Sequence, residues 1–284
     1  MANTITRFKK YVPLLDEVYK LASLTSVLDG PAEMMGEGAS ADEIVVPVMS
    51  TQGLANYNRG TGYSAGDVTL TNETFKCEYN RGRLFTVDTV DNMETAGVAF
   101  GRLAGEFIRT QVAPEIDAYR FSQYALKNGI GAATPADLTT GAEVVAALRT
   151  AASAMDDAEV PFTERYLFIT PALYGMVEDM DTTASRAVLG RFEQIIRVPQ
   201  TRFYNMITLS TNGYTKTSSS GRNLNFLVIH KPAVIQYNKH VAPKVITPEQ
   251  NQTADAWKFG YRVCGIADVY GQKVKGIYKH EATA

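Results

Sequence analysis

Residues 79–121 read YNRGRLFTVDTVDNMETAGVAFGRLAGEFIRTQVAPEIDAYRF, a strand-like start followed by the longest helical pattern in the chain. Apolar residues recur at helical spacing on both sides of Pro114, whose ring predicts a kink or break there. Asp91 is placed to cap the first turn. At about 1.5 Å per residue, a helix over 91–128 would extend about 57 Å. We therefore expect this element to be the spine of the fold.

Three glycines, Gly97, Gly101 and Gly105, occur four residues apart in this pattern and so share one face of the expected helix. Glycine inside a helix is less favourable than alanine by about 1 kcal/mol, and a folded chain keeps it where another element approaches closely. We therefore predict a strand or a second helix against this face. A membrane helix pair is excluded because Arg102 and Glu106 lie beside the glycines.

The segment before the spine, 44–90, is rich in strand-forming residues and in turns, which are marked by the glycines at 60–66 and by the triplet at 80–82. It is predicted to be a long hairpin. A two-stranded ribbon of this length is only marginally stable alone in water, so it must lie on another surface. The local sequence leaves open whether aromatic side chains anchor it to a neighbour or pack within its own faces. The candidate inter-subunit contacts are Tyr57, Tyr63, Phe75, Tyr79 and Phe85.

Near the N-terminus, residues 13–28 read PLLDEVYKLASLTSVL and place apolar side chains on one face at helical spacing. Gly30 and Pro31 end this pattern. The stripe predicts either a surface helix on its own domain or an arm buried against a neighbouring subunit. Its candidate contact residues are Leu14, Leu15 and Val18.

Beyond the spine, helical and strand patterns follow one another without regular alternation. The connection at 129–138 is rich in small residues and is a candidate boundary. Residues 141–157 form an amphipathic helical pattern, and YLFIT at 166–170 is typical of a short buried strand. Residues 211–223 have the composition of an exposed loop. Further strand patterns follow, so the predicted class is α+β.

The charge balance excludes a protein that grips nucleic acid through its phosphates, because the 284 residues include 28 basic and 30 acidic ones and the net charge is −2. No stretch reaches the roughly 18 consecutive apolar residues of a membrane helix. The two cysteines, Cys77 and Cys264, form neither a metal-binding motif nor a disulfide framework. We expect both to be reduced thiols in a cytosolic protein.

Residues that carry chemistry are few in this sequence. The three histidines form no HExxH or His-x-His motif, and neither a GxSxG elbow nor a phosphate-binding GxxxxGK[ST] loop occurs. Residues 36–41, GEGASA, match a degenerate dinucleotide fingerprint, but they follow a helix and lead into a strand, which is the wrong context. We therefore predict no catalytic residue, no cofactor and no metal site, and a protein that is not an enzyme.

The order of elements is an arm, a long hairpin, a spine helix, a mixed middle unit and late strands that return to the spine. Together with YVPLLDEVYKLASLTSVLD at 11–29, GYSAGDVTL at 62–70 and the stretch at 79–121, this order resembles the major capsid protein of tailed bacteriophages with the Hong Kong 97 type of shell fold. The stretch at 79–121 is similar to capsid proteins from phages of Gram-positive hosts. The resemblance covers nearly the whole chain, with 133–238 matched by pattern only.

The resemblance implies a division of the chain into four parts. An N-terminal arm, 1–43, would reach a neighbouring subunit, and an extended loop, 44–90, would lie over an adjacent subunit. A peripheral domain would combine the spine, 91–132, with the returning strands, 239–284. An axial domain, 133–238, would point towards the centres of the capsomers.

The function implied by the resemblance is structural. Subunits would self-assemble into the pentamers and hexamers of an icosahedral head, the virion capsid, which is assembled in the host cytoplasm and encloses double-stranded DNA with weak, non-specific contact. A portal and a decoration protein are further implied partners. Because Met1 stands directly before the arm, we expect any scaffolding protein to be a separate chain.

Two other functions remain open, and one feature of the family's type member is not expected. An encapsulin-like nanocompartment shell around an enzyme cargo would have a similar order of elements. A soluble α+β enzyme with a site of dispersed carboxylates is the alternative from another class. Lys76 is the only lysine between 44 and 90, and no local motif identifies a partner for it, so we predict no covalent crosslink between subunits.

Overall fold

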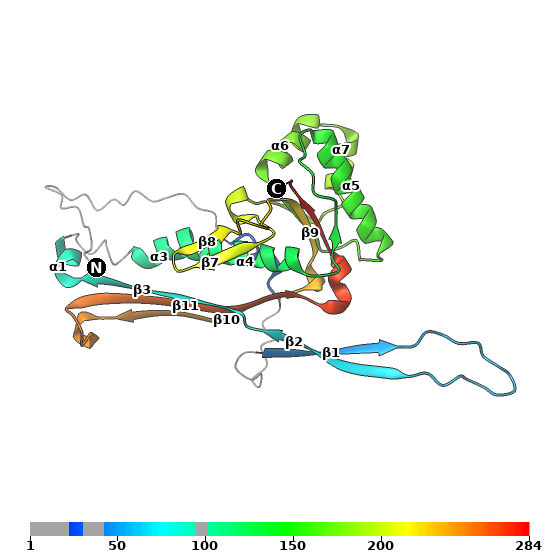
Figure 1. Cartoon of the computed structure of the whole chain (residues 1–284), viewed down its shortest axis with the longest axis horizontal. Coiled ribbons are helices and arrows are strands. Elements are labelled where there is room, and N and C mark those ends of the chain that lie inside the picture. The colour runs from blue at the N-terminus through cyan, green and yellow to red at the C-terminus, as the bar shows by residue number, and fades with distance from the viewer. Residues whose placement is uncertain (1–22, 31–42, 95–101, 284) are drawn as a thin grey trace.

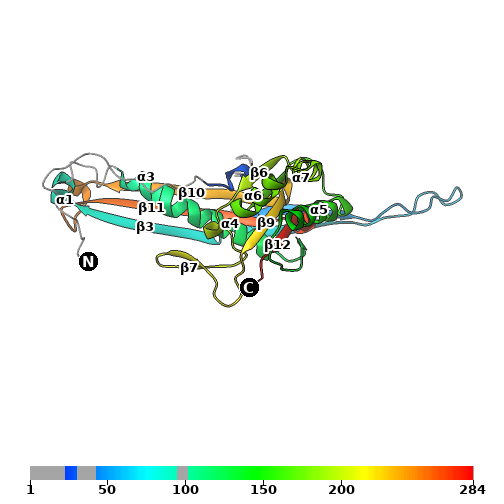
Figure 2. The same cartoon turned by 90° about the horizontal axis from the view of Figure 1, so that it is seen from above.

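The computed structural model describes residues 23–30, 43–94 and 102–283 of the chain. The molecule is elongated: long strands run beneath the spine helix, a unit of helices and strands rises above the end of these strands that faces the ribbon, and a two-stranded ribbon projects away from both (Figure 1). Seen from above, the ribbon leaves the body as a thin extension (Figure 2). No helix within these described residues is long and apolar enough to span a membrane.

The spine helix changes its hydrogen bonding just before the proline that the sequence singles out. α3 (Leu103–Phe107) continues through a π-helical turn, Ile108–Val112, into α4 (Ala113–Leu126). The amide of Ala113 donates to the carbonyl oxygen five residues earlier, which is the π pattern. Pro114 lies at the start of α4, directly after the π turn, and its missing N–H leaves one bond of the continuous helix unmade.

The helix before the spine begins earlier than the sequence predicts. α1 spans Thr89–Glu94, and the amide of Val90 donates to the Asp88 carboxylate at 2.9 Å. Asp88, rather than Asp91, therefore caps this helix, and Asp91 lies in its first turn. The residues that follow, 95–101, lie outside the described part of the chain.

A three-stranded antiparallel sheet lies beneath the spine. One of its faces packs on α3 and α4, with the Phe107 ring of α3 centred 4.7 Å from Phe85 and 6.1 Å from Tyr261. Tyr261 belongs to the main core, and the partly buried Phe85 and Phe107 rings pack against it, which stabilises the contact between helix and sheet. The strands, in order across the sheet, are β10 (Val234–Ile246), β11 (Ala256–Val269) and β3 (Tyr79–Asp88).

The ribbon is formed by β1 (Glu43–Thr51) and β2 (Val68–Lys76), which pair only with each other among the described strands. The prediction of one hairpin over 44–90 is therefore wrong in its last part, because β3 pairs with β11 and not with the ribbon. β3 begins within the predicted hairpin and belongs to the sheet of the spine.

The predicted turn at 80–82 is also wrong, because these residues lie inside β3. The chain passes from β2 to β3 at Cys77 and Glu78 instead. Gly82 serves close packing of strands: a Cβ added there would lie 3.0 Å from the carbonyl oxygen of Tyr261.

The unit above the spine is built on a second sheet whose two faces are both covered. On one face Leu167 and Val228 pack against the helices, and on the other Phe168 packs 5.1 Å, between ring centres, from Phe121 of α4. The strand order is β4 (Gly131–Ala132), β12 (Ile277–Glu281), β9 (Leu224–His230), β5 (Arg165–Ile169) and β6 (Gln194–Arg197). The helices are α5 (Gly141–Asp157), α6 (Pro171–Met180) and α7 (Thr183–Leu189).

Two sequence expectations change in this unit. β12 lies within the predicted peripheral segment 239–284 but pairs with β9, so the last strand joins the second sheet and not the first. The predicted loop at 211–223 is partly strand, because β7 (Ile207–Ser210) and β8 (Gly213–Lys216) form a hairpin.

The helix predicted over 13–28 does not continue through the part that the structure describes. Residues 23–30 form a bend and a 3-10 turn at Ser26–Leu28 beside α4, with Leu28 fully buried. Their polar groups bond to α4 and not to a continuing helix of their own. The other predicted contact residues of this segment, Leu14, Leu15 and Val18, lie outside the described residues.

Candidate functional site: the arm anchor, the strap and the ribbon

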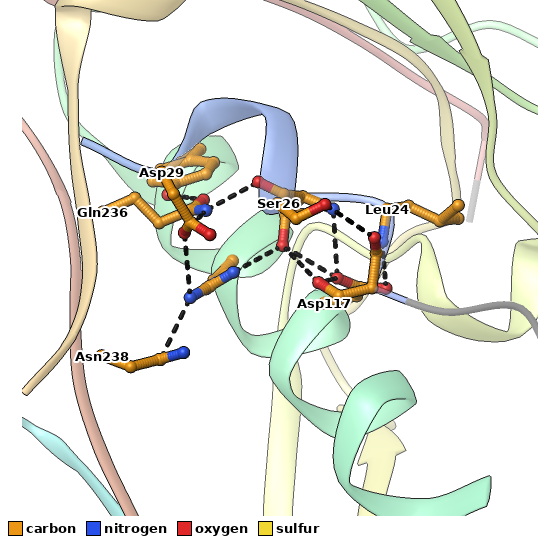
Figure 3. Close-up of polar contacts among 10 residues, drawn as sticks. Leu24, Ser26, Asp29, Asp117, Gln236 and Asn238 are labelled. Atoms are coloured by element: carbon orange, nitrogen blue, oxygen red, sulfur yellow. Dashed lines mark hydrogen bonds and ion pairs between the residues drawn. The ribbon is translucent and has the colours of Figure 1, made fainter. Parts of the chain in front are cut away.

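Asp117 of α4 is completely buried and binds residues 23–25, which lie inside the predicted arm, 1–43. Its carboxylate accepts hydrogen bonds from the hydroxyls of Ser23 and Thr25, both at 2.8 Å, and from the amides of Leu24 at 2.9 Å and Thr25 at 3.2 Å (Figure 3). Arg202 Nη1 donates to the same carboxylate at 3.1 Å. A buried carboxylate is stable only when it is satisfied in this way.

Arg120, three residues further along α4, extends this cluster towards β10. Its Nη1 donates to the Thr25 hydroxyl at 2.9 Å, and its Nη2 donates to the side-chain oxygen of Asn238 at 3.1 Å. The same Nη2 lies 3.5 Å from the Asp29 carboxylate. One buried arginine therefore joins the arm, the spine and the first sheet.

Gln236 of β10 completes the cluster from the side of the sheet. Its side-chain nitrogen donates to the carbonyl oxygen of Thr25 at 2.6 Å and to the Asp29 carboxylate at 2.7 Å (Figure 3). Its side-chain oxygen accepts from the Tyr124 hydroxyl at 2.6 Å. Burial raises the pKa of Tyr124, so this hydroxyl stays protonated and remains a donor.

We name these contacts the arm anchor. The sequence patterns do not predict it, although one signal is present: Asp117 and Arg120, three residues apart, lie among the apolar residues of the helical pattern around 116–124. Residues on the buried face of a helix are charged only when partners satisfy them. The members of the arm anchor are Asp117, Arg120, Tyr124, Arg202 and Gln236.

The tip of the β7–β8 hairpin is tied to β3 by two arginines. Arg83 Nη1 donates to the carbonyl oxygen of Thr211 at 2.7 Å, and Arg81 Nη2 donates to that of Ser210 at 2.6 Å. Arg81 Nε also pairs with the Glu115 carboxylate of α4 at 2.8 Å. We name the hairpin with these two arginines the strap, because it connects the second unit to the sheet and the spine.

A cavity of about 700 Å³ lies between the spine helix, β3 and the tip of the strap. Its wall includes the apolar side chains of Phe85, Leu103 and Phe107. At its rim the Tyr79 hydroxyl donates to Glu115 at 3.1 Å. Burial, together with this carboxylate, raises the pKa of Tyr79.

One face of the ribbon exposes apolar side chains, which we name the apolar ribbon face. Met49 lies opposite Leu70 across the two strands, and Val68 and Val45 extend the same face. These side chains are 52–65% exposed. The other face packs at its base on Phe75 and is partly covered there. The free subunit therefore leaves an apolar strip open to water, away from its own core.

The structure divides the five predicted aromatic contacts into two groups. Phe75 and Tyr79 are 1% and 4% exposed, and Phe85 packs against the spine, so these three rings pack on the body of the subunit and not only within the ribbon's own faces. Their strands bring them onto the core faces of the chain itself. Tyr57 and Tyr63 are 59% and 90% exposed, with ring centres 5.0 Å apart, and stay predicted contacts.

The close approach predicted at the spine glycines is absent where it can be checked. No atom of the described residues lies within 4 Å of a Cβ added at Gly105. Gly97 and Gly101 lie outside the described residues. Packing within the described part of the chain therefore does not explain why a glycine occupies position 105 of the helix.

The expectation of two free thiols is wrong in this structure, which joins Cys77 and Cys264 by a disulfide with their Cα atoms 6.6 Å apart. The two residues are distant in sequence, but β3 and β11 bring them together, because Cys264 lies opposite Asn80 at the start of β3. Sequence spacing alone could not show this proximity.

The described histidine side chains are structural. His230 and His280 are 7% and 4% exposed, and burial lowers the pKa of each. Asn225 Nδ2 lies 3.0 Å from His280 Nδ1, and the Phe226 ring stacks beside the imidazole with centres 5.1 Å apart. Within the described ranges, no group of three or more histidine, cysteine or acidic side chains is placed to hold a metal ion.

No protein family model and no curated protein matches the chain. Solved structures do match it over almost its full length. A structure from Mycobacterium phage Che8 has a TM-score of 0.66 at 14% identity and covers 99% of this chain and 98% of its own. The asymmetric unit of the bacteriophage PhiM1 mature capsid has a TM-score of 0.67 at 11% identity and covers 98% and 92%.

A virus-like particle from Pyrococcus furiosus is also similar, with a TM-score of 0.53 at 12% identity, covering 85% of this chain and 86% of its own. The agreement with the phage structures extends over the ribbon, the spine and both sheets, since it includes nearly every residue. The chain therefore has the Hong Kong 97 type of fold that phage capsid proteins share.

Proposed function

We propose that the chain is a major capsid protein, a structural subunit that self-assembles into the icosahedral head of a tailed phage, and not an enzyme. The observation that carries this proposal is the apolar ribbon face, which projects from a chain with a capsid fold. A two-stranded ribbon with an exposed apolar face is poorly stable alone in water, so it calls for a second surface.

The parts of the chain have distinct roles in this proposal. The arm, 1–43, reaches a neighbour beyond the point where the arm anchor holds its base. Of the extended loop predicted over 44–90, only the ribbon and its tip remain in this role, and they lie over an adjacent subunit. The peripheral domain, 91–132 and 239–284, gains β3, and the axial domain, 133–238, gains β12.

The subunits would form pentamers and hexamers that close into one shell. Many weak interfaces suit this assembly. Each one is weak enough for a wrongly placed subunit to dissociate, while their large number makes the closed shell stable. A scaffolding protein, a portal and a decoration protein are proposed partners on the resemblance alone.

The proposed content of the shell is double-stranded DNA, and its proposed place is the virion, after assembly in the host cytoplasm. The near-neutral charge of the chain, −2 overall, supports a container that touches DNA weakly, since tight binding needs many cations aimed at phosphates.

The direct test is electron microscopy with sedimentation of the purified full chain, alone and with a candidate scaffolding protein. We expect capsomers, tubes or closed shells. A chain that stays a monomer or dimer under all assembly conditions would contradict the proposal. Denaturing electrophoresis of mature shells should show single subunits, since we propose no covalent crosslink.

A second candidate is the shell of a nanocompartment with an enzyme cargo. The similarity to the Pyrococcus furiosus virus-like particle favours it, but that match covers less of the chain and has a lower TM-score than the phage structures. The content of particles purified from the native source decides between the two: DNA supports the phage head, and a co-purifying protein in fixed ratio supports the compartment.

A further inference from the structure

The Cys77–Cys264 bond crosses the point where the chain passes from the ribbon into the body. β2 ends at Lys76 and β3 begins at Tyr79, so Cys77 lies in the two-residue link between them. Cys264 lies in β11, the middle strand of the first sheet. The bond therefore ties the link covalently to the body.

The noncovalent contacts at the base of the ribbon are modest by comparison. The Phe75 ring lies edge to face with Tyr270 at 5.4 Å and packs on Ile266. The Glu73 carboxylate accepts from the amide of Gly271 at 3.0 Å. Phe75 is 1% exposed, so its burial and the contacts beside it set a preferred direction for the ribbon, but each of these contacts is reversible.

We propose that the Cys77–Cys264 pair is a redox-sensitive lock on the direction of the ribbon. In the dithiol form the ribbon pivots at Cys77 and Glu78, held only by the noncovalent contacts. In the disulfide form the link is fixed to β11. Cys77 is half-buried, so small thiol reagents can reach its sulfur, whereas Cys264 is 7% exposed.

Closing the lock is a two-electron oxidation. The two thiols lose two protons and two electrons and form one S–S bond. A low-molecular-weight disulfide accepts them and leaves as two thiols, and an excess of small thiol reverses the step. If the proposed function holds, a subunit would enter the shell with an adjustable ribbon, and oxidation would then fix the ribbon on its neighbour.

The test is hydrogen exchange of the full chain, unassembled, in oxidised and in reduced buffer, with the thiols counted by alkylation and mass spectrometry. We expect reduction to speed exchange at the base of the ribbon, 73–80, by about tenfold. Exchange in β9 should not change. Equal exchange in both states, with the thiol count confirming that the bond was opened, would overturn the proposal.

The matched control is the double variant Cys77→Ser, Cys264→Ser. It should exchange fast at the base of the ribbon in both buffers, and a response to reductant equal to that of the unsubstituted chain would overturn the proposal. Because the main comparison uses the unsubstituted chain, it stands even if this variant fails to fold.

Assembled shells test the extension, which rests on the proposed function. Oxidised shells should dissociate at a higher denaturant concentration than reduced ones. If oxidised and reduced shells dissociate at the same denaturant concentration, while reduction still speeds exchange in the free subunit, the disulfide has no role in assembly. The proposed lock then applies to the subunit alone. A chain that never forms shells would contradict the proposed function without bearing on the exchange result.

Discussion

Single buried side chains join parts of this chain that are far apart in sequence. Asp117 contacts residues 23–25 on one side and Arg202 on the other. Asp117 and Arg202 are both buried, so the loss of one leaves the charge of the other unsatisfied, which costs more than the pair itself contributes. The base of the arm is therefore held by electrostatics and hydrogen bonds.

The substitution Asp117→Asn tests this at the residue scale. Asparagine keeps the shape of the side chain but removes the negative charge that faces Arg202. Its NH2 group also points at N–H and O–H groups that are themselves hydrogen-bond donors. We expect the free energy of unfolding to fall by about 3 kcal/mol, with faster hydrogen exchange at Leu24 and Thr25. Denaturant unfolding measures the free energy of unfolding, and hydrogen-exchange mass spectrometry measures the exchange rates.

The matched control is Asp181→Asn, since Asp181 forms an exposed ion pair with Arg186. Such surface pairs contribute less than about 1 kcal/mol. An equal loss of stability in the two variants would show that Asp117 has no special role.

Burial of His280 predicts a pH dependence of stability. Its pKa is lowered in the folded chain, mainly by burial, from an ordinary value of 6.5. The unfolded chain therefore binds a proton more readily, and protonation also removes the ring nitrogen that can accept from Asn225. This contribution to stability is fully present above pH 6.5 and is lost as pH falls towards the lowered pKa.

Chemical unfolding at several pH values between 5 and 8 measures this effect. The variant His280→Asn should show a weaker fall in unfolding free energy below about pH 6.5 than the unsubstituted chain. If the unfolding free energy falls equally with pH in both proteins, the role of His280 is contradicted. His230, whose pKa burial also lowers, accounts for part of the slope that remains.

At the scale of elements, the strap sets how the second unit stands on the spine. Its arginines reach the backbone carbonyl oxygens of Ser210 and Thr211, and Arg83 Nη1 also donates to the side-chain oxygen of Asn212 at 3.2 Å. The connection therefore depends on Arg81 and Arg83, with one contribution from a side chain of the tip.

We expect Arg83→Ala to speed hydrogen exchange in β7 and β8 severalfold while changing global stability by less than about 1 kcal/mol. In shells, loss of the strap should broaden the distribution of particle diameters, because the angle between the two units is less fixed. Arg149→Ala, an exposed position on α5, is the control and should change neither quantity. Unchanged exchange in Arg83→Ala would argue against the strap.

The ribbon makes a prediction that separates folding from assembly. Leu70→Asp places a charge on the apolar ribbon face, where the free subunit leaves the side chain 64% exposed. We expect the melting temperature of the subunit to stay nearly constant and assembly, followed by light scattering, to be abolished. Thr69→Asp, on the opposite face of the same strand, is the control and should assemble. Normal assembly of Leu70→Asp would contradict the proposed role of this face.

How far the sequence could predict these elements depends on the range of the interaction. The long helical pattern, Pro114 and the strands were predictable, because they follow from local periodicity. The pairing of β3 with β11 was not predictable, because the sequence of one strand does not specify which other strand it pairs with. The arm anchor and the Cys77–Cys264 contact likewise depend on which strands become neighbours.

At the scale of the whole molecule, the balance of charge limits contact with DNA. We expect the unassembled subunit to leave duplex DNA unshifted in a gel at physiological salt, because its 28 basic residues are offset by 30 acidic ones and the chain has no net positive charge. A stable complex that persists at about 0.2 M salt would contradict this expectation. A small basic protein run in parallel confirms that the gel detects binding.

The placement of β12 has a consequence for the order in which the chain folds during synthesis. β12 lies between β4 and β9, although all the strands from β5 to β11 separate it from β4 in the sequence. The second sheet thus stays incomplete until residues 277–281 have left the ribosome. Nascent chains on one polysome therefore present an unfinished second sheet to each other. Under the proposed function, this would delay capsomer formation until synthesis has passed this strand.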